Sequence, residues 1–208
     1  MYIDITMTLS KDIPVFPNDT QFHIQEISQI KKGNVANVSF IEMGSHSATH
    51  IDAPKHFIDN GKSIDNIDLN LLIGTAKVFE IKNKNKISKE DLLNFDINEN
   101  DIILLKTDNN DKLLNNEFYK DFVYIDNSAA DYLVEKRIKA IGIDYLSIEY
   151  FYSKDYYVHK RLLSNNIIII EGLLLHNVKQ GVYKIYALPL KISNCDGAPA
   201  RVILEDIV

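Results

Sequence analysis

Two short, uninterrupted apolar segments constrain the fold of this chain more than any other feature of its sequence. Residues 101–107 read Asp-Ile-Ile-Leu-Leu-Lys-Thr, and residues 167–170 are four consecutive isoleucines. Runs of this length without polar alternation are typical of strands that are covered on both faces of a sheet. Helices predicted over residues 128–136 and 155–163, with a short strand at 140–143 between them, supply such covers. The sequence therefore predicts an α/β protein with a mixed sheet or barrel-like core and flanking helices.

Further strands are predicted where β-branched and aromatic residues alternate with polar ones. They cover residues 2–9, 22–30, 35–43, 72–81, 182–192 and 201–207. The second and third are joined by a turn at Lys32-Gly33-Asn34, and Ser88 and Asp91 form a capping box at the start of a short helix. No linker, charge block or internal repeat divides the chain, so we expect one domain over residues 1–208. With 208 residues, the chain is too short for a typical TIM barrel.

The charge balance and the cysteine content narrow the classes of partner and compartment. The 29 acidic and 23 basic residues give a net charge of −6, which argues against non-specific binding to nucleic acid or to an anionic membrane. Cys195 is the only cysteine, so an internal disulfide is excluded and a reducing compartment is favoured. No secretory signal is recognisable, and no apolar run approaches ~18 residues. We therefore expect a cytoplasmic protein that acts on a small molecule.

Potential metal ligands are concentrated in one segment of the chain. Three of the six histidines fall within eleven residues, and this segment holds His46, His50, Asp52 and His56. The ligands of one ion must lie within a few ångströms of one another. Two residues four positions apart are separated by ~13 Å in an extended strand, but by only about 5–6 Å at Cβ in a helical turn. If His46 and His50 share an ion, the segment must coil into a tight loop after a strand that ends near Gly44.

Two residues outside this segment are further candidate ligands. A set with carboxylate and without cysteine is more typical of a catalytic, partly open site than of a structural zinc site. Glu171 directly follows the predicted strand 167–170, and a carboxylate at the end of a buried strand is unfavourable unless it is paired or bound to a cation. His159 lies on a predicted helix. The remaining histidines, His23 and His176, have no partner pattern and are interpreted as structural or surface residues.

The histidine segment is part of a longer pattern. Residues 46–57 contain His-x3-His-x-Asp-x-Pro-x-His-Phe. Four further segments complete the pattern: Val15-Phe16-Pro17-Asn18-Asp19, Gly142-Ile143-Asp144 with Ser147, residues 159–173, and Ala198-Pro199-Ala200-Arg201. Together they resemble the kynurenine formamidase family, also called the cyclase family, which includes isatin hydrolase. Two positions depart from the family pattern, because Ala48 and Asn18 stand where the family usually has glycine.

This resemblance implies a metal centre, an architecture and an assembly. The ligands that it implies are His46, His50 and Asp52 for one ion, and Asp52, His159 and Glu171 for a second ion in members with a binuclear centre. His56 would act as the general acid/base. Donors of these types suit zinc, manganese and iron alike, and we expect zinc, or else manganese, with one or two ions per subunit. The resemblance also implies a swivelling β/β/α fold and a homo-oligomer, a dimer or a tetramer, with the active site near a subunit interface.

The activity that the resemblance implies is hydrolysis of a non-peptide C–N bond, as in an arylformamidase that converts N-formylkynurenine and water to kynurenine and formate. A divalent ion lowers the pKa of bound water from about 15.7 toward about 7, which makes hydroxide available at neutral pH. His56, with an ordinary pKa of about 6.5, is suited to take the proton of the water and hand it to the leaving nitrogen. Two alternatives stay open. One is a cyclic amide or lactone hydrolase similar to isatin hydrolase, and the other is a non-catalytic member that binds a metal or a ligand, against which the presence of His56 argues.

Several residues keep two interpretations at this point. Arg201 either holds a substrate carboxylate or forms a structural ion pair. The tyrosine-rich segment 150–157 is either an oligomer surface or a lid over the pocket. Asp144 and Ser147 are interpreted as turn residues. Ala48 in place of the family glycine could shift the loop that offers backbone groups to the substrate.

Overall fold

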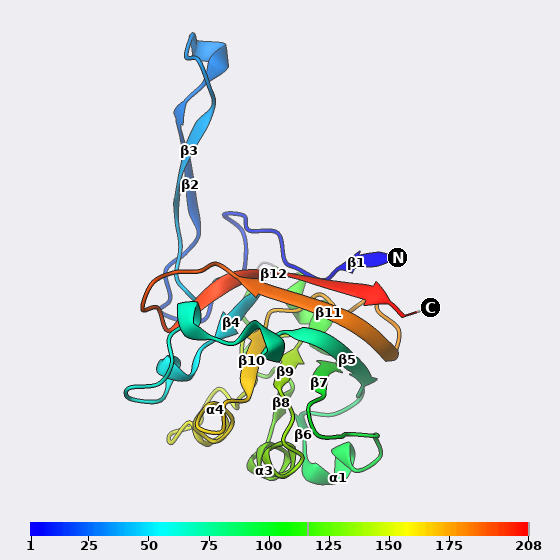
Figure 1. The fold of residues 1–208 in the computed structure, drawn as a ribbon. Coiled ribbons are helices and arrows are strands. Elements are labelled where there is room, and N and C mark those ends of the chain that lie inside the picture. The colour runs from blue at the N-terminus through cyan, green and yellow to red at the C-terminus, as the bar shows by residue number, and fades with distance from the viewer. Residues whose placement is uncertain (116, 208) are drawn as a thin grey trace.

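The computed structural model describes residues 1–115 and 117–207, and one eight-stranded sheet dominates this part of the chain (Figure 1). Its strands are β1 (Tyr2–Asp4), β4 (His50–Asp52), β5 (Ile73–Glu80), β7 (Ile102–Lys106), β9 (Ala140–Ile143), β10 (Ile168–Glu171), β11 (Gly181–Pro189) and β12 (Gly197–Asp206). Their order is β1-β12-β11-β5-β7-β9-β10-β4, and β4 also pairs with β12, so all strands of this sheet except β1 close into a ring. The predicted α/β protein with a mixed, barrel-like core is confirmed.

Parallel and antiparallel pairs divide this ring into two parts. β5, β7, β9 and β10 are parallel neighbours, whereas β4, β11 and β12 pair antiparallel with the strands beside them. The carboxyl ends of β7, β9 and β10 therefore meet at one edge of the ring. At this edge the backbone N–H and the hydroxyl of Thr107, directly after β7, each donate to the carboxylate of Asp144, directly after β9, at 2.7 Å.

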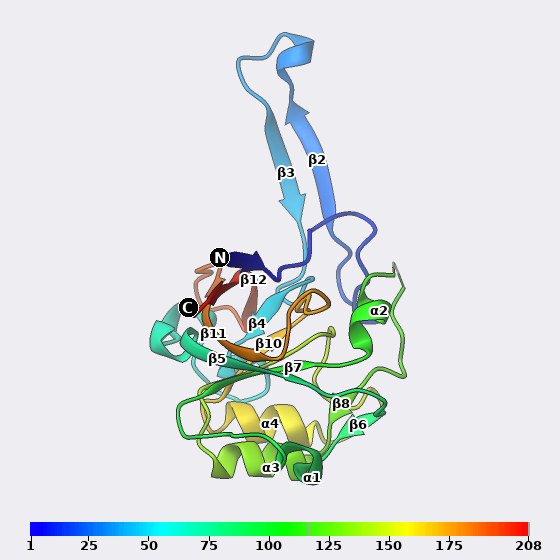
Figure 2. The ribbon, with the colours of Figure 1, turned by 90° about the vertical axis from the view of Figure 1, so that its right-hand side faces the viewer.

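The uninterrupted apolar strands contribute to two separate cores because successive side chains of a strand point to opposite faces. In β7, Ile102 and Leu104 belong to the core inside the ring, whereas Ile103 and Leu105 belong to the core between the ring and the helices. The helices on this side are α1 (Lys89–Leu92), α3 (Asn127–Glu135) and α4 (Tyr157–Leu163). Figure 2 shows them side by side beneath the sheet. Cover on both faces is the reason that these strands have no polar alternation.

Several shorter elements complete the described part of the chain. They are the helix α2 (Asn109–Leu113), the parallel strand pair β6 (Lys86–Ile87) and β8 (Tyr124–Ile125), and 3₁₀ turns at Ile30–Lys32, Pro54–His56, Ile64–Asn66 and Leu69–Leu71. α2, β6 and β8 are absent from the sequence prediction because these short segments show neither an uninterrupted apolar run nor a periodic pattern. The predicted capping box of α1 is confirmed, since the carboxylate of Asp91 accepts from the backbone N–H of Ser88 at 2.9 Å.

The segment that holds His46, His50 and Asp52 forms the expected loop after a strand only in part. Sharing of one ion by His46 and His50 would require a coil through His50, whereas the chain coils only as far as Thr49 and then forms β4 from His50 to Asp52. β4 lies between β10 and β12 and pairs antiparallel with both. This pairing comes from segments more than a hundred residues away, so no local pattern indicates it.

The strands at the two ends of the chain also differ from their predicted bounds. The last strand begins at Gly197 and not at residue 201, because residues 197–199 pair with β4. The first strand ends at Asp4 and not at residue 9. Beyond it, Thr6 makes one isolated antiparallel bridge with Leu173. Both differences arise from long-range pairing.

A two-stranded arm projects from the body of the molecule (Figure 1 and Figure 2). It consists of β2 (His23–Ser28) and β3 (Val38–Glu42), paired antiparallel. The predicted turn between them is confirmed, with Gly33 in the left-handed region at a φ of 87°. Large apolar side chains of the arm are exposed: Ile24, Ile27, Ile30, Val35, Val38, Phe40 and Ile41. Within the described residues, no helix has both the length and the apolar character that a membrane crossing requires.

Candidate metal centre

Strand pairing brings His50, Asp52 and Glu171 together. The register of β4 and β10 places His50 opposite Glu171. Ile51 points into the core inside the ring, so His50 and Asp52 point outward, toward α4, because they occupy alternate positions of the strand. All three side chains are buried, with exposed fractions of 1%, 1% and 3%. An imidazole and two carboxylates thus meet in the interior.

The turn before β4 is fixed by close backbone packing. Ala48 has a φ of 55°, in the left-handed region that glycine adopts most readily, so alanine retains the turn that the family glycine would allow. The hydroxyl of Thr49 donates to the carbonyl of Gly172 at 2.5 Å. A Cβ at Gly172 would lie 2.7 Å from the carbonyl carbon of Ala48. This packing brings the rings of His46 and His50 to a centroid distance of 5.0 Å.

His50 offers a lone pair to the interior of the cluster. Its Nδ1 lies 2.9 Å from the carbonyl oxygen of Ala48 and must be the donor, because a carbonyl can only accept. In the neutral ring Nε2 then carries the lone pair, and it lies 3.2 Å from Glu171 Oε2 and 3.5 Å from Asp52 Oδ1. Among the residues that the structure describes, neither His50 Nε2 nor Asp52 Oδ2 has a hydrogen-bond partner. Acceptor atoms that converge in the interior without a donor fit a bound cation.

His159 enters the same cluster from α4. Its Nδ1 donates to Glu149 at 2.6 Å, and its Nε2 lies 3.5 Å from Glu171 Oε1 and 3.8 Å from Asp52 Oδ2. Burial opposes protonation of His159, but hydrogen bonds to Glu149 and Glu171 and the charge of Asp52 raise its pKa to about 10. The predicted candidates His159 and Glu171 therefore lie beside Asp52.

His46 stands between two carboxylates. Its Nδ1 lies 2.8 Å from Asp52 Oδ1 and its Nε2 lies 2.7 Å from Asp196 Oδ2. Burial opposes protonation, but the charges of Asp52 and Asp196 and the hydrogen bonds to both raise the pKa of His46 to about 10. Binding of a cation at either nitrogen would require the loss of that proton, so metal binding here would release protons to the solvent.

Asp52 is shared by two groups of potential ligands. Donor atoms within 4.8 Å of one another are found in His46, Asp52 and His56, and in His50, Asp52 and Glu171. The sharing of Asp52 agrees with the bridging position that the family resemblance implies, whereas His46 and His50 fall in different groups. Burial opposes ionisation of both Asp52 and Glu171, and the charge of Asp52 also opposes ionisation of Glu171. The surrounding histidines outweigh these effects and hold the pKa of each carboxyl below its usual range. Both are therefore ionised and suited to a cation.

His56 lies beside the cluster and toward its open side. Its ring packs against His46 with a centroid distance of 3.9 Å, and its Nδ1 lies 3.5 Å from Asp196 Oδ2. The side chain is 28% exposed, in contrast to the fully buried His50. Burial is the largest effect on its pKa, which lies below its ordinary value. A neutral imidazole at this position is suited to accept a proton.

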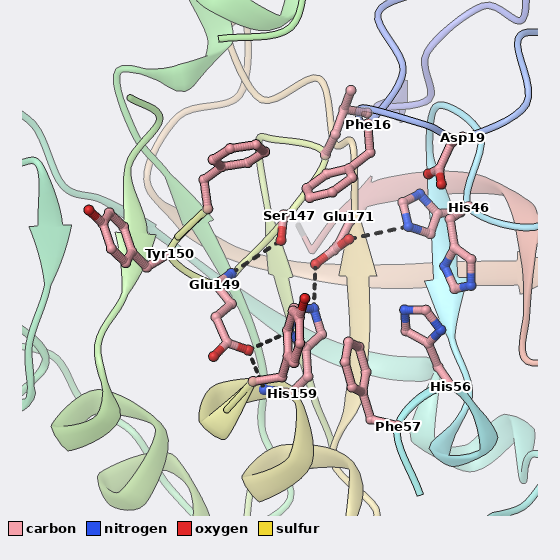
Figure 3. Close-up of a pocket in the computed structure, with 14 residues that line it drawn as sticks. Phe16, Asp19, His46, His56, Phe57, Ser147, Glu149, Tyr150, His159 and Glu171 are labelled. Atoms are coloured by element: carbon pink, nitrogen blue, oxygen red, sulfur yellow. Dashed lines mark hydrogen bonds and ion pairs between the residues drawn. The ribbon is translucent and has the colours of Figure 1, made fainter. Parts of the chain in front are cut away.

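The cluster forms the floor of a pocket of about 300 Å³ (Figure 3). Besides the histidines and carboxylates, its lining includes Phe16, Phe57, Leu146, Ser147, Tyr150, Phe151 and Tyr156. The tyrosine-rich segment 150–157 therefore contributes to the pocket wall. Arg201 lies elsewhere and forms an exposed ion pair with Asp4 at 2.9 Å from Nε, which agrees with the structural interpretation. Pockets of this size and apolar character suit a small aromatic ligand.

Two carboxylates of the site are absent from the sequence prediction. Asp196 lies in the turn before β12 and is 150 positions from His46, so only the β4–β12 pairing brings them together. Glu149 follows an apolar segment beyond β9 and is 4% exposed. A carboxylate within apolar sequence is the same signal that identifies Glu171, and it could have identified Glu149.

The barrel-like mixed sheet and the buried His/Asp/Glu cluster at one of its edges are the arrangement expected for the cyclase family that the motifs resemble. A comparison with known families gives the same result. Residues 3–150 match the sequence profile of the family described as "Putative cyclase". The chain belongs to this family. The resemblance stated from the motifs is thereby confirmed.

Proteins similar to this chain in sequence include several kynurenine formamidases. The chain is 34% identical to one from a strain of Bacillus cereus over 206 residues, which cover 99% of this chain and 98% of that protein. It is 37% identical to one from Geobacillus thermodenitrificans over 205 residues, with 98% and 97% covered.

Solved structures with the same fold include hydrolases. A predicted metal-dependent hydrolase from Bacillus stearothermophilus has a TM-score of 0.86 and 37% identity, with 98% of this chain and 97% of that chain covered. Isatin hydrolase A from Labrenzia aggregata has a TM-score of 0.85 over 98% of this chain and 93% of that chain, and at 23% identity it supports the fold alone.

Proposed function

We propose that this chain is a metal-dependent hydrolase of a non-peptide C–N bond, with arylformamidase activity on N-formylkynurenine or a closely similar aryl formamide. The observation that carries the proposal is the convergence of buried acceptor atoms around Asp52, next to a half-buried His56 that faces an aromatic pocket. The names of the relatives agree with this activity. The whole chain, residues 1–208, is proposed to serve this one activity.

The residues that would hold divalent metal are His46, His50, Asp52, His159 and Glu171. Zinc is the proposed metal, with manganese as the alternative, because imidazole and carboxylate suit both. These residues would hold one ion, or two ions with Asp52 as a ligand common to both. A bound divalent ion supplies Lewis acidity, which lowers the pKa of bound water to about 7 and polarises a carbonyl oxygen.

His56 is proposed to move the proton. It takes a proton from the attacking water and delivers it to the nitrogen of the substrate. One C–O bond forms, the C–N bond breaks, and the products are the aryl amine and formic acid, which ionises to formate. Asp196, 3.5 Å from His56 Nδ1, supports the orientation of the ring for both transfers.

The walls of the pocket are proposed to select an aromatic substrate. Phe16, Phe57, Tyr150, Phe151 and Tyr156 offer ring faces and edges, against which an aryl group packs favourably. A second candidate activity is hydrolysis of an uncharged cyclic amide such as isatin. It is favoured by one observation, which is that the described residues of the pocket wall include no lysine or arginine for a substrate carboxylate.

A comparison of substrates with a His56→Ala variant tests the proposal. Wild-type protein loaded with zinc is assayed on N-formylkynurenine, a simple aryl formamide, isatin and a lactone. We expect turnover of the formamides and a decrease in kcat by a factor of about 100 or more in His56→Ala. Full kcat is expected in the control His176→Ala, whose side chain is exposed and forms a hydrogen bond with Asn177. Full activity of His56→Ala, or full activity after complete chelation, would contradict the proposal.

We further propose that the chain forms a homodimer through the arm, in the reducing environment of the cytoplasm. Every residue of β2 and β3 except Ser28 is exposed, and apolar side chains lie on both faces of the arm. An isolated two-stranded hairpin is only marginally stable in water, and exposed apolar surface of this extent indicates a partner. A second copy of the chain covers the exposed apolar side chains of both arms at once, because a two-fold interface uses the same surface of each copy.

A further inference from the structure

Glu149 is a buried carboxylate that contacts His159 on the side away from the acceptor cluster (Figure 3). Its Oε2 accepts the Nδ1–H of His159 at 2.6 Å and the backbone N–H of the same residue at 3.1 Å. Its Oε1 accepts from the hydroxyl of Ser153 at 2.7 Å and from the backbone N–H of Val158 at 3.3 Å. Both oxygens of Glu149 are therefore occupied by donors, and His159 is the one residue among these donors that also belongs to the cluster around Asp52.

We propose that Glu149 is a positioning residue that fixes Nε2 of His159 as a metal ligand. The inference rests on the proposed function, in which His159 binds an ion. A neutral imidazole carries one N–H, and the carboxylate of Glu149 holds it on Nδ1. The lone pair is then on Nε2, which faces Asp52 and Glu171. A carboxylate at the remote nitrogen fixes both the tautomer and the orientation of a ligating ring.

Glu149 also holds the start of the helix on which His159 stands. α4 begins after Tyr156, whose side chain makes no capping hydrogen bond within the described part of the chain. The first-turn N–H groups of Val158 and His159 donate to Glu149 instead. The same carboxylate therefore fixes both the backbone and the ring of His159, so a rotation of either away from the cluster would break hydrogen bonds in the interior.

The effect of Glu149 is confined to one ligand because each histidine of the cluster has a different partner. His50 donates to the backbone carbonyl of Ala48, and His46 contacts Asp196. A change at Glu149 leaves both of these contacts in place. We therefore expect a selective loss of affinity for the ion that His159 binds.

Zinc titration against a competing chelator tests this expectation on three variants and the wild type. His159→Ala identifies the ion that His159 binds. In Glu149→Gln, the side chain keeps its shape but presents an N–H₂ group to donors, and we expect the affinity for that same ion to fall by about 10- to 100-fold. Ser153→Ala is the matched control, because it removes a donor to Glu149 but leaves the carboxylate on His159, and we expect it to bind zinc like the wild type.

Nitrogen-15 NMR of the histidine rings in the zinc-loaded wild type supplies a measurement that does not depend on a folded variant. We expect a protonated Nδ1 and a metal-bound Nε2 for His159. Binding of zinc through Nδ1, unchanged affinity in Glu149→Gln, or no loss of an ion in His159→Ala would overturn the inference. Complete absence of zinc from the wild type would instead overturn the proposed function, so the two failures are distinguishable.

Discussion

His56 differs from the other histidines of the site in having a ring that is partly open to the pocket. His50 and His159 are almost fully buried and turn their Nε2 atoms to carboxylates, whereas His56 is 28% exposed and packs against the ring of His46. Its burial favours the neutral imidazole. The positive charges of nearby histidines act in the same direction, against the charges of Asp52 and Glu171.

This environment predicts the protonation of His56 at neutral pH. Because burial lowers the pKa of His56 below 6.5, the ring is neutral at pH 7, is able to accept a proton, and becomes protonated only as the pH falls below 6.5. A bound divalent cation strengthens the same trend. An NMR titration of the zinc-loaded protein, with the signal assigned by its absence in His56→Ala, should give a midpoint below 6.5. A midpoint above this value would contradict the role of His56 as a base.

The residues of the site differ in how far the sequence indicates them. His46, His50, Asp52 and His56 are evident because a scarce residue type is concentrated in one segment. Glu171 follows from the unfavourable burial of a carboxylate at a strand end. Asp196 has no such signal, because its partner is 150 positions away and the contact depends on strand pairing.

At the scale of elements, β4 closes the ring of strands, and this strand is not predicted from the sequence. Three residues, His50–Asp52, form a strand because β10 and β12 leave a position between them. A segment this short has no alternation to recognise. The strands β5, β7 and β9, by contrast, are close to their predicted bounds because their own apolar residues determine them.

The turn before β4 depends on Gly172, which provides a test of the packing. With a φ of 70° and a Cβ that would overlap the backbone of Ala48, Gly172→Ala combines backbone strain of about 1–3 kcal/mol with overpacking of about 1–3 kcal/mol. We expect the free energy of unfolding, from urea titration, to fall by about 2–6 kcal/mol. The matched control is Gly33→Ala, where the φ is 87° but no atom of residues 1–115 and 117–207 lies within 4 Å of the added Cβ. An equal loss in the two variants would exclude a role of close packing at Gly172.

The arm formed by β2 and β3 predicts the effect of a charge on the assembly. Phe40 is 49% exposed on β3, and a charged residue there would be unfavourable in an apolar interface. Light scattering should therefore give twice the chain mass of 23.8 kDa for the wild type and the mass of one chain for Phe40→Asp. Leu93→Asp, at an exposed apolar position after α1, should keep the wild-type mass. A monomeric wild type would contradict the proposed dimer.

At the scale of the whole molecule, the metal centre joins segments that are distant in the sequence. Its groups come from the turn before β4, from β4 and β10, and from α4. A ligand that binds only the folded state stabilises it according to its concentration relative to the dissociation constant. The family pattern therefore indicates the candidate ligands from the sequence, while the closed sheet determines how these residues come together.

Because the candidate ligands meet only in the folded state, we expect zinc binding to stabilise the protein. At a free zinc concentration of 100 times the dissociation constant, the free energy of unfolding should rise by about 2.7 kcal/mol for each ion bound. Thermal unfolding with and without zinc, at one protein concentration, measures the increase as a higher Tm. Excess chelator should reverse it. An unchanged Tm at saturating zinc would show that the cluster does not bind zinc in the folded state.

Asp52 is common to both groups of potential ligands and is buried among histidines, so the proposed metal centre depends on it most directly. The decisive measurement is the metal content of dialysed wild-type and Asp52→Asn proteins, determined by elemental analysis together with turnover of an aryl formamide. We predict at least one divalent ion per wild-type chain, and neither metal nor turnover in a folded Asp52→Asn variant. A variant that retains the metal content and the activity of the wild type would contradict the account.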